Sequence, residues 1–339
     1  MKIVIDAFGG DNAPDVILEG SVAALKQAQG FELILTGDEA VLKQKLSAYE
    51  YDASRITIKH APQVIGMHDS PVKAIKEKTE SSLVVALKTV ADKEADVVIS
   101  AGSTGAVLSG ATLIVRRIKG VKRPALAPVL PCRDGSGVLL IDCGANVDCK
   151  PAYLQQFGVM GSIYMKTVMG VEEPKVGLIN NGAEEEKGNA LTSTAHQLLK
   201  KSPIHFLGNI EGRDILSGEF DVAVADGFVG NVVLKFMEGF AKDLFSMLKD
   251  ELYASFRAKM GAMLLKPALK QFKGKLDYTE YGGALLLGID GGVIKAHGSS
   301  DARAIKATIM QAKRFGENNV VGNIRQELEK IDFDELGRE

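Results

Sequence analysis

The first loop of the chain carries residue types that favour the binding of a small anion. It reads IDAFGGDNAP over residues 5–14 and follows a short, apolar, β-branched strand pattern. The adjacent Gly9 and Gly10 allow the backbone to approach a ligand closely or to adopt a positive φ. Asn12 is a good N-cap and Pro14 suits a first helical turn, so we expect a helix to start here. Free N–H groups at that helix start favour a phosphate or a carboxylate, and the loop does not distinguish between the two.

Four more loops of similar composition follow predicted strands. They read SAGSTGA (100–106), DCGAN (142–146), NNGAEEEKGN (180–189) and DGFVGN (226–231). The carboxyl ends of parallel strands meet at one edge of a sheet, which is where ligands bind in α/β proteins. A single glycine-rich loop is often only a tight turn, but several at one edge indicate a shared binding site.

Common nucleophile motifs are missing from the chain. It contains no GxSxG elbow, no Walker A loop and no HExxH helix. The three cysteines, Cys132, Cys143 and Cys149, lack zinc-ligand spacing and a neighbouring histidine, which is typical of reduced cytosolic thiols. We therefore expect no metal and no cofactor. The loops suit a reaction in which a bound small anion attacks and the protein supplies position and charge stabilisation.

Strand and helix patterns, which must position these loops, alternate along nearly the whole chain. Continuously apolar strands are expected at residues 1–5, 31–36, 55–59, 96–100, 137–142, 175–180, 204–207 and 221–226. Helices are expected at residues 39–48, 71–92, 106–118, 151–169, 185–201 and 300–317. The alternation predicts a mostly parallel sheet covered by helices on both faces, within a single α/β domain over residues 1–339.

The composition restricts the classes of function. The chain has 339 residues, a formal net charge of −2 and no tryptophan, which argues against a nucleic-acid partner. No apolar run approaches membrane-spanning length, and no signal peptide is recognised at the start. We therefore expect a cytoplasmic protein.

Residues 236–275 break the alternation and predict a helical hairpin, interrupted near Gly261 and Pro267. Apolar and basic residues alternate there at helical spacing: Leu252, Phe256, Arg257, Lys259, Met260, Met263 and Leu264. One interpretation is an amphipathic pair that packs on the core or across a dimer interface. The other is a hairpin tip that contacts a membrane or an acidic partner.

Six motifs occur in a fixed order between Met1 and about Gly316: IDAFGGDNAP, SAGSTGA, LIDCGAN, EEEKGN, DGFVGNVVLK and GIDGGVIKAHGSSDARA. Together they resemble the bacterial phosphate acyltransferases, which make acyl-phosphate from acyl-carrier protein and inorganic phosphate. The resemblance implies an α/β/α sandwich related to phosphate acetyltransferases and to isocitrate and isopropylmalate dehydrogenases. It also implies a homodimer, peripheral attachment to the inner face of the cell membrane, and a role in phospholipid synthesis. The product would pass to a membrane glycerol-3-phosphate acyltransferase.

In that reaction phosphate attacks a thioester carbonyl, so the protein must hold phosphate and stabilise an oxyanion. The predicted phosphate seat is Gly9, Gly10 and Asn12, with Ser103 and Thr104 at a second helix start. Lys187 is the charged candidate for phosphate or the oxyanion, unless it belongs to a solvated charge run. His297 is a candidate general acid toward the leaving thiolate, or a structural hydrogen-bonding partner. Substrate-binding or turn-capping positions at the other loops are Asn146, Asn189, Gly230 and Asn231, of which Asn231 is the catalytic candidate.

Three other functions make different demands on the sequence. A phosphate acetyltransferase using short acyl-CoA would need the same loops, and only chain-length preference separates it from the first. A decarboxylating dehydrogenase would need a metal-binding aspartate cluster and several arginines for the substrate carboxylates, and the sequence offers neither. A non-enzymatic alternative is a membrane-surface scaffold organised by residues 236–275, whose lysines would also suit docking of acidic acyl-carrier protein.

Overall fold

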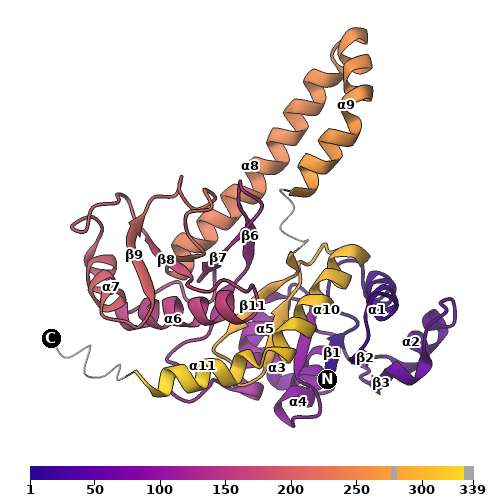
Figure 1. The fold of residues 1–339 in the computed structure, drawn as a ribbon. Helices are drawn as coiled ribbons and strands as arrows, with labels where there is room; N and C mark the ends of the chain where they lie inside the picture. The colour runs from indigo at the N-terminus through magenta and orange to yellow at the C-terminus, as the bar shows by residue number, and fades with distance from the viewer. Residues whose placement is uncertain (276–280, 332–339) are drawn as a thin grey trace.

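The first sheet combines the N-terminal part of the chain with two late strands (Figure 1). The structure, a computed structural model, describes residues 1–275 and 281–331. The seven strands run in the order β3 (Ile56–His60), β2 (Glu32–Gly37), β1 (Lys2–Asp6), β4 (Val97–Ser100), β12 (Gly292–Lys295), β11 (Ala284–Leu287) and β5 (Ala125–Ala127). Strands β3 to β12 are parallel, whereas β11 is antiparallel to both of its neighbours. The late strand β12 therefore lies directly beside β4.

The second sheet has five strands. Their order is β6 (Val129–Pro131), β7 (Gly137–Ile141), β10 (Val222–Val224), β8 (Lys175–Ile179) and β9 (His205–Ile210), and only β6 is antiparallel. Pro128, which lacks a backbone N–H, lies between β5 of the first sheet and β6 of the second. The predicted α/β class with mostly parallel strands is confirmed. However, the strands form two sheets rather than the single sheet expected, because apolar strand patterns do not specify their pairing partners.

Helices pack on both faces of the first sheet (Figure 1). On one face, Ile17 and Ile305 share a buried cluster with Ile3, and on the other Leu87 shares a second cluster with Val4. This follows from the two-residue period of a strand, which sends successive side chains to opposite faces. The helices are α1 (Asp15–Gln27), α2 (Glu39–Leu46), α3 (Pro71–Glu77), α4 (Ser82–Ala91), α5 (Thr104–Gly110), α6 (Pro151–Thr167), α7 (Ala190–Lys200), α8 (Gly227–Tyr253), α9 (Phe256–Lys275), α10 (Ala302–Glu317) and α11 (Val320–Glu329).

One apolar core joins the two sheets. The cluster that contains Ile3 and Ile99 of the first sheet also contains Leu139 and Val222 of the second. The prediction of a single domain over residues 1–339 stays a prediction, and its segments 276–280 and 332–339 lie outside the described residues.

Several predicted helix boundaries are wrong, and in two cases a side-chain cap starts a new helix. The helix expected at 71–92 is divided into α3 and α4, and the Ser81 hydroxyl accepts the Val84 N–H at 3.4 Å at the second start. The helix expected at 185–201 begins only at Ala190, where Asn189 and Thr192 form a capping box. The helix expected at 106–118 starts earlier, as α5, and continues as a π-helix (Ala111–Val115). Helix α11 was not expected.

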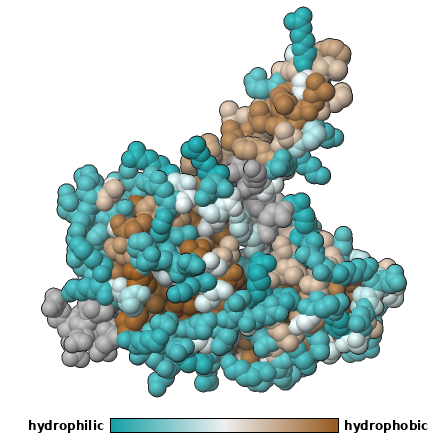
Figure 2. Space-filling model, viewed as in Figure 1, coloured by the Kyte–Doolittle hydropathy of each residue, from teal (hydrophilic) through white to brown (hydrophobic). Residues whose placement is uncertain are grey.

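The predicted hairpin is present, but its turn lies elsewhere. Helix α8 begins at Gly227 and continues to Tyr253, so the turn lies at residues 254–255. The Ser255 hydroxyl accepts the Ala258 N–H at 3.1 Å and starts α9, whereas Gly261 and Pro267 lie inside that helix. The hairpin projects away from the rest of the molecule and carries apolar surface along its length (Figures 1 and 2). No helix within the described ranges 1–275 and 281–331 is long and apolar enough to cross a membrane.

The close contact between α1 and α10 depends on Gly20. A Cβ atom at Gly20 would lie 2.7 Å from the Ala302 carbonyl oxygen and 2.7 Å from the Ile305 Cβ. We predict that Gly20→Ala lowers the free energy of unfolding by about 1–3 kcal/mol, because the two helices must separate. Urea unfolding measures this change.

Gly239→Ala is the matched control. Gly239 is also helical, but a Cβ there would meet nothing within 4 Å. This variant should keep or gain about 1 kcal/mol, because alanine is the better helix former. Equal unfolding free energies for the two variants would contradict the proposed close packing.

Candidate functional site

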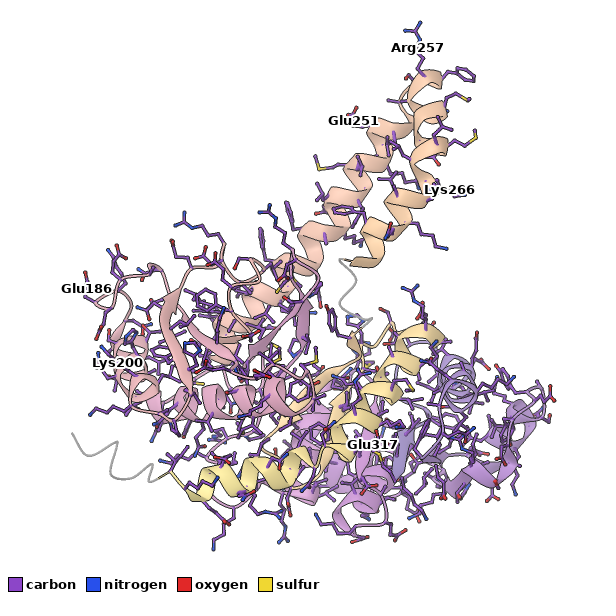
Figure 3. The ribbon with its side chains drawn as sticks, viewed as in Figure 1. Glu186, Lys200, Glu251, Arg257, Lys266 and Glu317 are labelled. Carbon is purple, nitrogen blue, oxygen red and sulfur yellow. The ribbon has the colours of Figure 1, made fainter. Side chains whose placement is uncertain are left out.

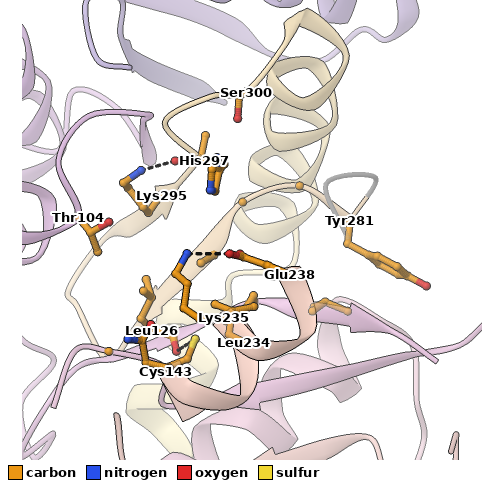
Figure 4. Close-up of a pocket in the computed structure, with 18 of the residues that line it drawn as sticks. Thr104, Leu126, Cys143, Leu234, Lys235, Glu238, Tyr281, Lys295, His297 and Ser300 are labelled. Carbon is orange, nitrogen blue, oxygen red and sulfur yellow. Dashed lines mark hydrogen bonds and ion pairs between the residues drawn. The ribbon is translucent and has the colours of Figure 1, made fainter. Parts of the chain in front are cut away.

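A cavity of about 360 Å³ lies where loops from both sheets meet (Figure 4). Thr104 follows β4, Cys143 and Gly144 follow β7, and His297 follows β12. The first turns of α8 and residues 281–284 complete the wall. Three of the five predicted strand-end loops, 100–106, 142–146 and 226–231, therefore meet at this place, whereas residues 5–14 and 180–189 do not line the cavity.

Both apolar and polar side chains line the cavity. Apolar contacts come from Leu108, Leu126, Pro128, Val129 and Leu234. Polar and charged side chains come from Thr104, Asn231, Lys235, Glu238, Lys295, His297 and Ser300. Lys235 and Glu238 form an ion pair at 2.8 Å on α8. Apolar and cationic surface in one cavity suits a ligand with an acyl part and an anionic part.

Like Lys235 and Glu238, Lys295 is a charged residue of the cavity that the sequence analysis missed. It ends β12 and is only 8% exposed. Its ammonium group donates to the Ala101 carbonyl oxygen at 3.3 Å and to that of Ala296. Burial lowers its pKa to about 8, against the opposing effect of Asp6 and Asp11. A lysine closing the otherwise apolar run Gly-Val-Ile-Lys was the available signal, because a buried strand rarely ends in an unpaired charge.

Gly9 and Gly10 hold the first loop against its neighbours and do not line the cavity. A Cβ at Gly9 would lie 2.4 Å from the Asp6 carboxylate, and Gly10 has a φ of +106° beside Ala101. The Asp6 carboxylate accepts the Ser100 hydroxyl at 2.7 Å, and burial raises its pKa. These close approaches explain the two glycines by packing.

Asn12 does not cap α1, so that prediction is wrong. The N-cap residue is Pro14, which has no side-chain cap, and Asn12 is exposed. Only the Asn12 carbonyl takes part, by accepting the Val16 N–H at 3.4 Å. The tight turn of the loop lies at Gly9 and Gly10, and the N-cap position falls at Pro14, two residues later than expected.

Asn146 is used to hold a buried carboxylate. Its amide donates to Asp142 at 2.9 Å and to the Pro124 carbonyl at 2.7 Å. Asp142 also accepts the N–H groups of Leu126, Ala145 and Asn146, at 2.8, 3.2 and 2.7 Å, and burial raises its pKa. Asn146 is therefore a structural partner here and does not line the cavity.

Gly230 belongs to the same contact. A Cβ at Gly230 would lie 1.9 Å from the Asp142 carbonyl oxygen, so only glycine lets α8 approach this loop. Its neighbour Asn231 extends into the cavity wall.

Lys187 and Asn189 lie outside the cavity. Asn189 accepts the Thr192 N–H at 3.0 Å as the cap of α7, and Lys187 is exposed. Figure 3 shows Glu186, from the same loop, at an outer edge of the molecule. A role of Lys187 toward substrate stays a prediction.

Thr104, Asn231 and His297 are the predicted residues that the cavity brings together. The Nδ1 atom of His297 accepts the Ser299 N–H at 3.2 Å and lies 2.8 Å from the Ser299 hydroxyl. Because a backbone N–H only donates, we assign the proton of the neutral ring to Nε2. Ser103 precedes α5 as its N-cap residue and does not line the cavity.

The hairpin tip presents apolar side chains to the surroundings. The exposed fractions are 80% for Phe256, 46% for Met260, 64% for Met263 and 82% for Leu264. Leu252 is half-buried. Arg257 and Lys259 are exposed among them, and Figure 3 shows Arg257 at the tip.

Metal ligands do not gather in the part of the chain that is described. Residues 1–275 and 281–331 contain no group of three or more His, Cys, Asp or Glu side chains that could hold a metal ion. All three cysteines are free thiols, and burial holds the pKa of Cys143 well above its usual value.

The architecture is that of the phosphotransacetylases. A phosphotransacetylase from Streptococcus pyogenes superposes with a TM-score of 0.61 at 16% identity, covering 97% of this chain and 94% of that one. A branched-chain phosphotransacylase from Enterococcus faecalis V583 gives 0.56 at 15% identity, covering 93% and 98%. At such identities the likeness shows the fold alone.

The family follows from sequence comparison. The profile of the family described as "Fatty acid synthesis protein" matches residues 1–323. A protein from Clostridium novyi (strain NT) named phosphate acyltransferase is 52% identical over 330 residues, covering 97% of this chain and 99% of that one. A phosphate acyltransferase from Clostridium botulinum (strain Loch Maree / Type A3) is 51% identical over 328 residues, covering 97% and 98%. The chain belongs to this family, and the resemblance indicated by the six motifs is confirmed.

Asn146 and Asn231 provide a test of structural against substrate-binding roles. We predict that Asn146→Ala lowers the free energy of unfolding by about 1–3 kcal/mol, because Asp142 and the Pro124 carbonyl each lose a buried donor. Asn231→Ala should change it by less than about 0.5 kcal/mol, because that side chain is exposed. Urea unfolding and turnover are measured for both variants.

The two variants should separate in activity as well. Asn231→Ala is expected to reduce turnover while the fold is intact. If the Asn146→Ala variant is as stable as the parent, the hydrogen bonds of the Asn146 amide to Asp142 and Pro124 do not stabilise the fold.

Proposed function

We propose that this chain is a phosphate acyltransferase that transfers a long-chain fatty acyl group from acyl-carrier protein to inorganic phosphate. The observation that carries the proposal is the cavity, which the cation of Lys295 and the ring of His297 line together with apolar side chains. Family membership and the names of the relatives support it. The product would be an acyl-phosphate used in phospholipid synthesis.

The reaction needs no enzyme nucleophile. A phosphate oxygen attacks the thioester carbonyl, a tetrahedral oxyanion forms, and the carbon–sulfur bond breaks to release the carrier thiolate, which then takes up a proton. Cys143 lines the cavity, but its thiol donates to the Leu126 carbonyl oxygen at 3.3 Å and its raised pKa keeps it protonated. A protonated thiol is a poor nucleophile, which favours direct attack by phosphate.

The polar side chains of the cavity have distinct proposed roles. The Nε2–H of His297 and the amide of Asn231 are neutral donors suited to an oxyanion. Thr104 offers a hydroxyl at the start of α5. Lys187 would contribute from its exposed loop only after the loop moved toward the cavity.

The hairpin is proposed to hold the enzyme at the inner face of the membrane, where a glycerol-3-phosphate acyltransferase would receive the acyl-phosphate. Exposed apolar residues at the tip of α9, with cations among them, suit the boundary of an anionic bilayer. The exposed stripe Phe228, Val232, Phe236 and Phe240 on α8 suits the proposed homodimer, because it recurs every four residues along one helix face. Docking of acidic carrier protein on the hairpin cations is the alternative use.

The activity is tested by incubating the protein with palmitoyl-acyl-carrier protein and inorganic phosphate. We expect loss of thioester that depends on phosphate, with acyl-phosphate trapped as the hydroxamate by hydroxylamine. Omission of phosphate controls for direct reaction of hydroxylamine with the thioester. Thioester loss that does not depend on phosphate would refute the proposal.

Acetyl-CoA in the same assay separates the long-chain carrier substrate from the short acyl-CoA alternative. Faster turnover of acetyl-CoA would assign the chain to the phosphate acetyltransferase type. A Lys187→Ala variant with parental turnover would remove Lys187 from the mechanism.

The hairpin is tested with the double variant Phe256→Glu, Leu264→Glu. Each parent side chain is at least 80% exposed, so the substitutions should not disturb the fold. Burying a large apolar side chain gains about 1.5–3 kcal/mol, so binding to anionic phospholipid vesicles should weaken at least about 100-fold. Vesicle flotation measures binding, and turnover of soluble substrate should be retained.

Gln271→Glu is the matched control, since it also adds a carboxylate to an exposed position of α9. It should bind vesicles as the parent does. Parental binding by the double variant would refute a membrane-inserting tip.

A further inference from the structure

Lys295 has one hydrogen-bond donor available to the cavity. An ammonium group has three N–H donors. Two are used by the carbonyl oxygens of Ala101 and Ala296, and the side chain lines the cavity. Figure 4 shows Lys295 near His297 in the wall of this cavity. The third donor is therefore placed for a ligand.

The position of this cation is determined by the backbone. Lys295 pairs with Ser100 of β4 and with Ala284 of β11, so it stands in the interior of the seven-stranded sheet. Its two acceptors begin the loops that lead to Thr104 and to His297. One lysine thus holds together the two loops that supply these donors.

The charge of Lys295 is not neutralised by its hydrogen bonds. Both acceptors are neutral carbonyl oxygens, and within residues 1–275 and 281–331 no carboxylate is bonded to its ammonium group. Asp6 lies near enough to act on it through space, but the Asp6 carboxylate is bound by the Ser100 hydroxyl. A buried charge without a bonded counter-ion is expensive, and an anionic ligand at Lys295 would offset that cost.

We propose that Lys295 binds an oxygen of the phosphate substrate through its third N–H, while the acyl thioester lies along Leu108, Leu126 and Leu234. This inference rests on the proposed function and deepens it by locating the phosphate. Lys295 remains protonated throughout. It holds the attacking anion, and the proton taken up by the leaving thiolate comes from elsewhere.

The protonation of Lys295 supports this role and predicts a pH profile. Burial lowers its pKa to about 8, Lys235 acts in the same direction, and Asp6 and Asp11 oppose both. Glu238 and His297 also line the cavity. The free enzyme therefore loses its phosphate-binding cation as the pH rises through about 8. Bound phosphate favours the charged form and moves this loss to higher pH in the complex.

The test compares Lys295→Met, Lys295→Arg and the parent in the phosphate-dependent assay. Lys295→Met should lower kcat/KM for phosphate by about 10- to 100-fold, the usual effect of losing a charge-assisted hydrogen bond, with KM for the acyl thioester within about twofold. The parent should lose kcat/KM for phosphate above pH 8, whereas Lys295→Arg should not, because guanidinium stays protonated.

Lys59→Met is the matched control. Lys59 is also a strand lysine near the carboxyl end of a strand in the first sheet, but it lies on the edge strand β3 and pairs with Glu94. It should leave both KM values unchanged. Thermal unfolding of each variant with and without inorganic phosphate provides a second measurement: phosphate should stabilise the parent and not Lys295→Met.

Each adverse result has its own meaning. An unchanged kcat/KM for phosphate in Lys295→Met would overturn the inference. Equal rises of both KM values together with a lower Tm would assign Lys295 a structural role only. Absence of phosphate-dependent turnover in the parent would defeat the proposed function instead, and phosphate-dependent Tm shifts would still decide whether Lys295 holds the anion.

Discussion

The buried carboxylate of Asp142 is the interaction on which the site depends. It accepts the N–H of Leu126, which belongs to β5 of the first sheet, and N–H groups of the loop after β7 in the second. Its own carbonyl oxygen sits against Gly230 at the start of α8. One residue therefore connects both sheets and the helix that continues into the hairpin. A carboxylate buried at this junction is tolerated because its acceptor sites are filled by donors.

The cavity follows from this junction. Because the sheets meet near the carboxyl ends of β4, β12 and β7, the loops after these strands face one another, and the first turns of α8 close the remaining side. Asp6 and Lys295 bring opposite charges to the same edge, but hydroxyl and carbonyl partners occupy them separately. The Lys295 ammonium group thus remains available for an anionic substrate. The packing of the loops and the proposed phosphate binding therefore depend on the same residue.

The predicted site residues form two groups: some line the cavity, and others are explained by packing within their loops. Thr104, Asn231 and His297 line the cavity, from the start of α5, an early turn of α8 and the loop after β12, and their roles toward substrate stay predictions. Gly9, Gly10, Asn146 and Gly230 were recognised as special, but close backbone approach and a buried carboxylate explain them without a ligand. Lys295 was not predicted, because a strand pattern alone does not show that the last residue of the strand is buried beside a cavity.

The sequence by itself determined the α/β class, the strand-end loops, the family motifs and the existence of a helical hairpin. These features are local, since they depend on side-chain periodicity, glycine content and residue order. Only the tertiary structure decided that the strands form two sheets, that the hairpin turns at residues 254–255, and that Lys295 lies buried in the cavity. The reason is physical: strand pairing and the burial of a charge depend on contacts between segments far apart in the chain, which no local pattern encodes.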